Sequence, residues 1–208
     1  MTLSPSFRKK LIEVALPLET ISKESTYEKM PGIGPHPRGI HHWWARRPLT
    51  ACRAVIFASL VDDPSAWPEI YSSIDEQNAE RERLFHILKE LSNWKNSNDA
   101  EILNEALLEI ARSISRKNGD NLPESPELIR GYIERHAPPI FDPFCGRGSI
   151  PLEGQRLGLK AFGNDLNPVA ALISKATIEI PSVFCGYRPI HPESNIQQKL
   201  IEGYQGTE

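Results

Sequence analysis

The feature that most constrains the fold is an alternation of apolar runs and helical patterns in the second half of the chain. A short apolar run at 140–144 is followed by a tight glycine turn at 146–148 and a helical pattern at 149–157. A second apolar run at 160–166 leads into a second helical pattern at 168–177. This order is typical of the opening of a parallel, doubly wound sheet, so the region predicts an α/β fold.

Two strands are too few for such a sheet. Two parallel strands with their helices cannot cover both faces of a sheet or satisfy its edges. Either the preceding region contributes more than its pattern reveals, or the chain is the N-terminal part of a larger fold, which we favour. We therefore expect residues 138–181 to be the front of a domain and residues 182–208 to be a tail of its truncated remainder.

Helical patterns precede this region. Apolar residues recur at helical spacing over 7–25, where Pro17 is expected to kink or split the helix. A loop rich in proline and glycine follows, and Pro48 is placed in the first turn of a helix at 48–61 that is apolar on nearly every side. We assign residues 1–64 to an N-terminal helical region that carries the basic motif W-W-A-R-R-P.

Charge is distributed unevenly along the chain, although the net charge is only -3. Residues 29–61 hold five Lys and Arg and no acid, whereas residues 62–137 hold sixteen acids and nine bases. The basic stretch would attract phosphate or another anion, but its acidic surroundings argue against a generally basic nucleic-acid binder. We assign residues 65–137 to an acidic helical insertion, with helices near 66–93, 99–117 and 125–136.

Composition excludes several classes of protein. With 39% apolar residues and four Trp the chain can form a packed core. Its longest apolar runs, such as 54–60, are shorter than the roughly 20 residues of a membrane span, and no secretory signal pattern is present. Cys52, Cys145 and Cys185 lack the spacing of a disulfide scaffold or zinc module. We expect a reduced, cytoplasmic protein without a membrane or metal partner.

The glycine turn is the candidate ligand-binding site of the chain. Glycines between a strand and a helix let a ligand approach the backbone, and the free N–H groups of the helix attract a carboxylate or phosphate. Pro151 stands where the nicotinamide fingerprint needs its third glycine, and no P-loop lysine follows. Asp165 lies seventeen residues after Gly148, in position to accept hydrogen bonds from both hydroxyls of a ribose. The alternatives are an ordinary turn without a ligand and an N-cap role for Asp165.

Several motifs in two parts of the chain resemble a known family. D-P-F-C-G-x-G-S-I-P-L-E and G-x-D-L-N-P-V-A are similar to the first two cofactor motifs of S-adenosylmethionine-dependent amino-methyltransferases, which methylate exocyclic amines of DNA bases. Upstream, R-K-K-L-I-E-V-A-L-P-L-E and H-x-W-W-A-R-R-P-L-x-A-C-R-A-V-I-F-A resemble the start of large adenine-specific DNA methylases with a zinc-ribbon insertion. The resemblance covers residues 7–64 and 139–181 and does not extend to the acidic insertion.

The resemblance implies the start of a Rossmann-like methyltransferase sheet, preceded by a helical N-terminal region and a helical insertion. It implies S-adenosyl-L-methionine as cofactor, DNA as partner, and a role in restriction-modification or phage defence. The family pattern predicts cofactor contacts by Asp142, Pro143, Phe144, Cys145, Gly146, Gly148, Asp165, Leu166, Trp44 and Arg46. Arg147 and Asn164 depart from the pattern, because a small residue and a Ser or Thr are expected there.

The motif W-W-A-R-R-P has a second interpretation. Arginines that bind phosphates and tryptophans that stack on bases would form a nucleic-acid platform, with His41, Trp43 and Arg47 as its contacts. Lining of the cofactor pocket and plain packing are the alternatives. A metal site at His36, His41 and His42 is disfavoured, because no helical pair of ligands is present.

The catalytic signature of these enzymes, [DNS]-P-P-[YFW], is absent. The chain's Pro-Pro, at 138–139, has neither the polar nor the aromatic neighbour, and it precedes the cofactor motif. We therefore expect the N-terminal part of an adenine methyltransferase that has no catalytic residue of its own and is inactive alone. A second polypeptide would then carry the catalytic half. The alternative is a non-catalytic or split module that binds nucleic acid or a partner.

Overall fold

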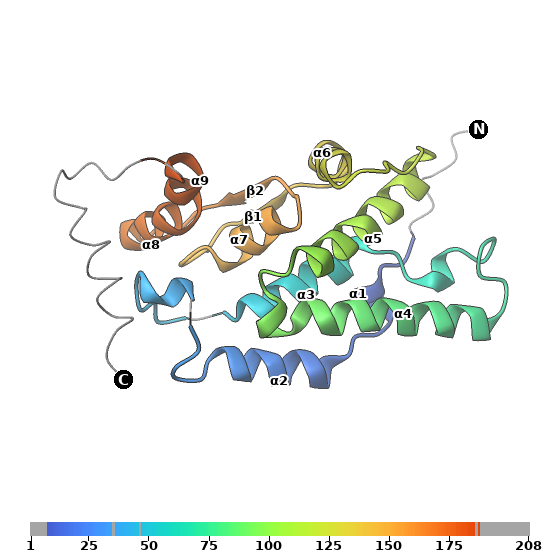
Figure 1. Ribbon diagram of the computed structural model, residues 1–208, viewed down its shortest axis with the longest axis horizontal. Coiled ribbons are helices and arrows are strands. Elements are labelled where there is room, and N and C mark those ends of the chain that lie inside the picture. Colours follow the sequence, from blue (N-terminus) through green and yellow to red (C-terminus); the bar gives the residue numbers. More distant parts are fainter. Residues whose placement is uncertain (1–7, 35, 46, 186, 188–208) are drawn as a thin grey trace, which may run out of the picture.

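The computed structural model describes residues 8–34, 36–45, 47–185 and 187. Most of these residues form helices, and the strands among them are a single parallel pair. In Figure 1 helices α1 to α5 gather in the lower and right-hand part, whereas the two strands lie with α7, α8 and α9 in the upper left. The described fold is therefore mostly helical with a small parallel sheet.

Pro17 splits the first predicted helix in two, as expected. Helix α1 (Leu11–Val14) ends before it, and Pro17 is the N-cap of α2 (Leu18–Glu28). The break follows from the fixed φ and missing N–H of proline. The predicted second helix is confirmed as α3 (Leu49–Leu60), and nine of its twelve residues are buried. Pro48 precedes its first turn as the N-cap.

The acidic stretch is helical, as predicted. Its helices are α4 (Ile74–Ser92), α5 (Ala100–Asn118) and α6 (Pro126–His136). Helix α4 begins later than predicted, because Ser73 and Glu76 form a reciprocal capping box at its start. Gly119, with a φ of 73°, ends α5 in the left-handed conformation. No helix among the described residues is long and apolar enough to cross a membrane.

One hydrophobic core joins the helical regions. Buried side chains of α4, α5 and α6 pack in the same cluster as those of α1, α2 and α3. Leu157 and Leu159, which follow α7, belong to it as well. Most acidic side chains of the insertion thus lie outside a core that the N-terminal helices share, although Glu109 is buried. The glycine turn is anchored to that core through α7.

The two strands are joined by a helix in the predicted order. Strands β1 (Ile140–Asp142) and β2 (Ala161–Gly163) pair in parallel, with α7 (Ser149–Arg156) between them in sequence. Helix α7 lies close to the sheet because Gly154 has no side chain; a Cβ there would lie 3.3 Å from Cδ1 of Ile140. The strand-helix-strand unit is therefore present.

The sheet is smaller than the sequence indicates. Each strand has three residues, because the ends of the predicted runs 140–144 and 160–166 form the glycine turn and the loop at Asp165. Helix α8 (Pro168–Ser174) continues through a π-helical turn (Lys175–Glu179) into α9 (Ile180–Phe184), past the predicted end at 177. No third strand lies within the described residues, so a larger Rossmann-like sheet stays a prediction.

Candidate cofactor cleft at the glycine turn

Two glycines in the left-handed conformation shape the turn between β1 and α7. Gly146 has a φ of +53° and Gly148 a φ of +82°, which side chains with a Cβ rarely adopt. A Cβ on Gly146 would lie 2.8 Å from the indole Nε1 of Trp43, and one on Gly148 would lie 2.8 Å from Cδ1 of Ile178. Backbone conformation and close packing both require glycine at these positions.

Asp165 ties the end of β2 to this turn. One of its carboxylate oxygens accepts the backbone N–H of Gly146 at 2.8 Å, and the other accepts that of Asn167 at 2.9 Å. The side chain of Asn167, not that of Asp165, caps α8. Each carboxylate oxygen has a further lone pair, so Asp165 can still accept a hydrogen bond from a ligand hydroxyl.

The turn forms one side of a cleft of about 210 Å³. Asp142 lies at its edge and accepts the backbone N–H of Phe144 at 3.1 Å. The opposite wall comes from the loop before α3, with Trp43, Ala45 and Arg47. The structure thus brings together two motifs about a hundred residues apart in sequence.

Five of the ten predicted cofactor residues line this cleft: Asp142, Phe144, Cys145, Gly146 and Asp165. Gly148 supports it as the N-cap of α7, and Pro143 is exposed. Leu166 and Trp44 do not line it, and their side chains are 91% and 93% exposed. Arg46 lies outside the described residues.

Of the three residues predicted to contact nucleic acid, two line the cleft and one does not. Trp43 and Arg47 line the cleft, although Trp44 was the tryptophan expected there. His41 is exposed, with its ring centroid 6.4 Å from that of Trp43. The assignment of Trp44 to the cofactor and Trp43 to nucleic acid does not match this cleft, because the loop has no periodicity from which to infer side-chain direction.

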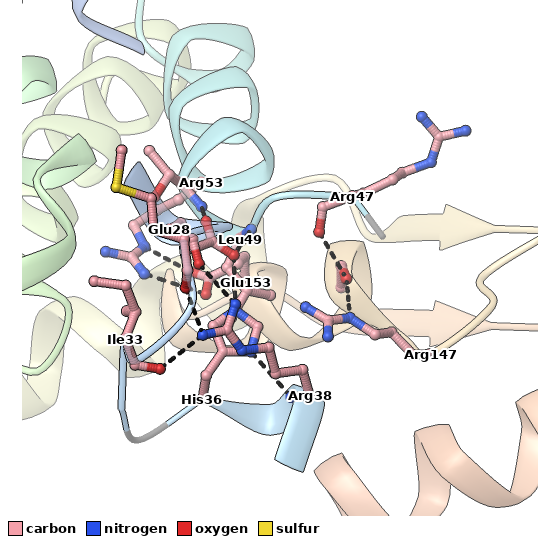
Figure 2. A network of polar contacts seen from close by, with 12 residues as sticks. Glu28, Ile33, His36, Arg38, Arg47, Leu49, Arg53, Arg147 and Glu153 are labelled. Carbon is pink, nitrogen blue, oxygen red and sulfur yellow. Dashed lines mark hydrogen bonds and ion pairs between the residues drawn. The ribbon is translucent and has the colours of Figure 1, made fainter. Parts of the chain in front are cut away.

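Arg147 is held in the protein and is 5% exposed. Its Nε donates to the hydroxyl of Ser149 at 3.2 Å, and that hydroxyl donates to the carbonyl of Arg47 at 3.4 Å. Figure 2 shows the Arg147 side chain directed toward His36 and Arg38, and a small cavity is lined by all three. Arg147, which departs from the family pattern, therefore connects the glycine turn to the N-terminal loop.

Glu28 anchors the loop that carries Trp43, a role that the sequence did not reveal. The Glu28 side chain is 2% exposed and accepts the backbone N–H groups of Leu49 and Thr50 at 2.9 and 3.0 Å. His36 contacts the same carboxylate through Nε2 at 2.8 Å, as Figure 2 shows. Burial raises the pKa of Glu28, but the hydrogen bonds from His36, Thr50 and Leu49 lower it by more than burial raises it. The pKa of Glu28 therefore lies below its ordinary value.

His36 and Arg38 are structural in this loop. The Nδ1 atom of His36 accepts the backbone N–H of Arg38, and its ring stacks on Trp94 with centroids 5.0 Å apart. The Arg38 guanidinium donates to the carbonyls of Glu28, Met30 and Ile33. Among the described residues, no group of three His, Cys, Asp or Glu side chains is arranged to hold a metal ion.

The basic stretch is less electropositive than its composition suggests. Arg53 is 1% exposed and forms two hydrogen bonds with the carboxylate of Glu153, at 2.6 and 3.2 Å. Arg38 is committed to backbone carbonyls. Of the described bases in this stretch, Lys29 and Arg47 are the ones that face solvent.

The cleft combines two carboxylates with two arginines, Arg47 and Arg147, and offers acceptors for the hydroxyl groups and positive charge of a ligand. Asp142 and Asp165 supply carboxylate oxygens, and the rings of Trp43 and Phe144 supply faces that attract a cation. The glycine at position 146 lets the indole of Trp43 lie directly against the backbone of the turn. At about 210 Å³ the cleft is smaller than the roughly 300–1,000 Å³ of most ligand sites, so it would enclose only part of a nucleoside.

Comparisons with known proteins give two partial matches. A family described as "Protein of unknown function (DUF1156)" matches residues 15–87, which include the loop of Trp43 but not the glycine turn. The type II methyltransferase M.MvaI of Kocuria varians is 37% identical over 57 residues, which cover 24% of this chain and 13% of that enzyme. No solved structure matches the chain.

Proposed function

We propose that the chain is the N-terminal part of an S-adenosylmethionine-dependent DNA methyltransferase that acts on the exocyclic amine of adenine. One observation carries the proposal: the glycine turn, Asp165 and the loop of Trp43 meet in a single cleft. These are the three segments that the family resemblance assigns to the cofactor. The partial similarity to a type II methyltransferase supports the same class.

Asp165 is proposed to hold the ribose, and Asp142 the positively charged methionine end of the cofactor. Trp43 would close that end, since it already lies against Gly146. The bound cofactor would supply the methyl group that is transferred. The contribution of this chain would be to hold and orient it, which is a large part of catalysis in a direct transfer between two bound groups.

The mouth of the cleft is proposed to face DNA. Trp44 is 93% exposed, and His41 and Arg47 are exposed on the same loop. An exposed indole can stack on a base, and an arginine can bind a phosphate. Methylation of an exocyclic amine requires a base turned out of the helix, for which such a stacking surface is suited.

A second polypeptide or further strands are proposed to complete the sheet. Phe141 and Phe162 are opposite one another on the paired strands and are 64% and 57% exposed. A single parallel pair has two unpaired edges, which proteins normally pair or cover. The missing [DNS]-P-P-[YFW] loop would come from the same source.

The alternative function is a non-catalytic or split module that binds nucleic acid or a partner. It is favoured by the absence of that loop from the printed sequence. Incubation with labelled S-adenosylmethionine and unmethylated DNA separates the two cases. We expect no label in DNA with the chain alone and label when the product of the neighbouring reading frame is added. Label with the chain alone would contradict the assignment of an incomplete site. Label in neither reaction would favour the non-catalytic form.

A further inference from the structure

A second, larger pocket lies on the other flank of α7. Its volume is about 800 Å³, within the range of sites that hold a nucleotide-sized ligand. Its walls come from residues 32–34, 36, 37 and 40, from the segment Trp94 to Asn98 and from the side chains of Leu152 and Arg156. None of its lining residues also lines the cleft at the glycine turn. We refer to it as the Arg156 pocket.

The charge of the Arg156 pocket is positive. Lys95 and Arg156 line it, and none of the described residues that line it is Asp or Glu. Arg156 and the buried Arg53 share the one carboxylate of Glu153, so this group of three side chains has an excess of one positive charge. An anion in the pocket would offset that charge.

Arg156 is itself destabilised as a cation, by burial and by its charged neighbour. Its pKa is lowered, first by burial and then by the charge of Arg53, and the carboxylate of Glu153 opposes this only in part. The second guanidinium nitrogen donates to the side-chain carbonyl of Asn98 at 3.4 Å, a long hydrogen bond. Of the acids beside the pocket, Glu24 accepts the backbone N–H of Trp94 at 3.4 Å, and Glu28 is occupied by His36 and the amides of α3 (Figure 2).

The remaining lining combines rings with polar groups. Tyr27 and Trp94 offer aromatic surface beside aliphatic side chains. The hydroxyl of Ser97, in a residue that is 8% exposed, has no hydrogen-bond partner among the described atoms. Gly32 has a φ of +80° and open space where a Cβ would be, so backbone borders the pocket directly.

We propose that the Arg156 pocket binds a nucleoside phosphate, with the phosphate at Arg156 and Lys95 and the base against the rings of Trp94 and Tyr27. Arginine and lysine are suited to phosphate, and aromatic faces accept any base. The nucleotide is either free or part of a DNA strand, and the binding is separate from that of the cofactor.

Calorimetric titration of the full chain with dAMP, with a short single-stranded oligonucleotide and with inorganic phosphate tests this. Arg156→Gln and Lys95→Ala should each weaken dAMP binding by about tenfold or more, the usual effect of losing a charge-assisted hydrogen bond. Arg156→Lys should recover part of the affinity. The exposed Arg135→Gln and Lys117→Ala are matched controls that should leave it unchanged.

The outcomes are distinct. Arg53 keeps both hydrogen bonds with Glu153 in the Arg156→Gln variant, and an unchanged melting temperature would exclude a folding defect. Tighter binding of the oligonucleotide than of dAMP would identify DNA as the source, and the reverse would identify a free nucleotide. Failure of dAMP to bind at millimolar concentration would overturn the proposal. Binding of dAMP by Arg156→Gln and Lys95→Ala as tight as by the natural protein would also overturn it. Loss of dAMP binding in Asp165→Ala would do so too, because the nucleotide would then occupy the cofactor cleft.

Discussion

Trp43 lies against Gly146 so closely that a Cβ on the glycine would be 2.8 Å from the indole nitrogen. The contact joins the loop before α3 to the turn after β1, and it forms one corner of the candidate cofactor cleft. A site assembled from two distant segments depends on such contacts. Its geometry can therefore be changed without touching the ligand.

Gly146→Ala tests this contact. The left-handed backbone alone should cost about 1–2 kcal/mol of stability, and displacement of Trp43 should weaken cofactor binding further. Urea unfolding and cofactor titration measure the two effects. Gly131→Ala is the matched control, because its site on α6 has open space and a helical backbone. It should stabilise the protein by about 0.5–1 kcal/mol. Full cofactor affinity in Gly146→Ala would contradict the proposed corner.

The buried pair of Arg53 and Glu153 is expected to hold α7 against α3. Glu153→Ala would leave Arg53 and Arg156 without their shared carboxylate, at a cost of about 3–5 kcal/mol. Chemical denaturation measures the loss. Lys175→Ala, which removes an exposed ion pair with Glu179 at 3.9 Å, should have little effect. Similar stability in the two variants would show that the buried pair does not connect the helices.

The lowered pKa of Glu28 predicts that the protein loses stability as the pH becomes acid. Because its folded-state pKa lies below the ordinary value of 4.5, its contribution to stability is present above about pH 4.5 and is lost as the pH falls through the folded pKa. Glu28→Gln should cost about 1–2 kcal/mol at neutral pH and flatten the acid limb of the stability curve. The control is Glu134→Gln, an exposed carboxylate whose removal should leave the curve unchanged. An acid limb of undiminished slope in Glu28→Gln would disprove the assignment.

Asp165→Ala should weaken cofactor binding by about 1.5–3 kcal/mol, roughly tenfold or more. The side chain also ties Gly146 to β2, so a weaker affinity by itself does not prove a ribose contact. A cofactor analogue without ribose hydroxyls separates the two effects. It should bind more weakly than the cofactor to the natural protein but no more weakly to the variant. An equal loss from the analogue in both proteins would refute the ribose contact.

Periodic patterns and proline chemistry made the secondary structure predictable. The split at Pro17, the buried α3 and the strand-helix-strand order all follow from local rules. The turn at Gly146 and Asp165 was also found from spacing, because the ends of parallel strands lie together at one edge of a sheet.

Other features depend on tertiary contacts that no local pattern encodes. Glu28 resembles any acid near the end of a helix, and its role follows only from the position of α3 and His36. Arg53 was counted as part of an electropositive stretch, although its place on an apolar helix indicated burial. The choice between Trp43 and Trp44 was settled by the path of an irregular loop.

The central claim is that the glycine turn and the loop of Trp43 form an S-adenosylmethionine site. Ultraviolet cross-linking of labelled S-adenosylmethionine to the chain, followed by mass spectrometry of its peptides, tests this most directly. The label should be saturable and should lie within residues 41–47 or 142–149, and unlabelled cofactor should displace it. Absence of saturable label, or label confined to peptides of the Arg156 pocket, would contradict the claim.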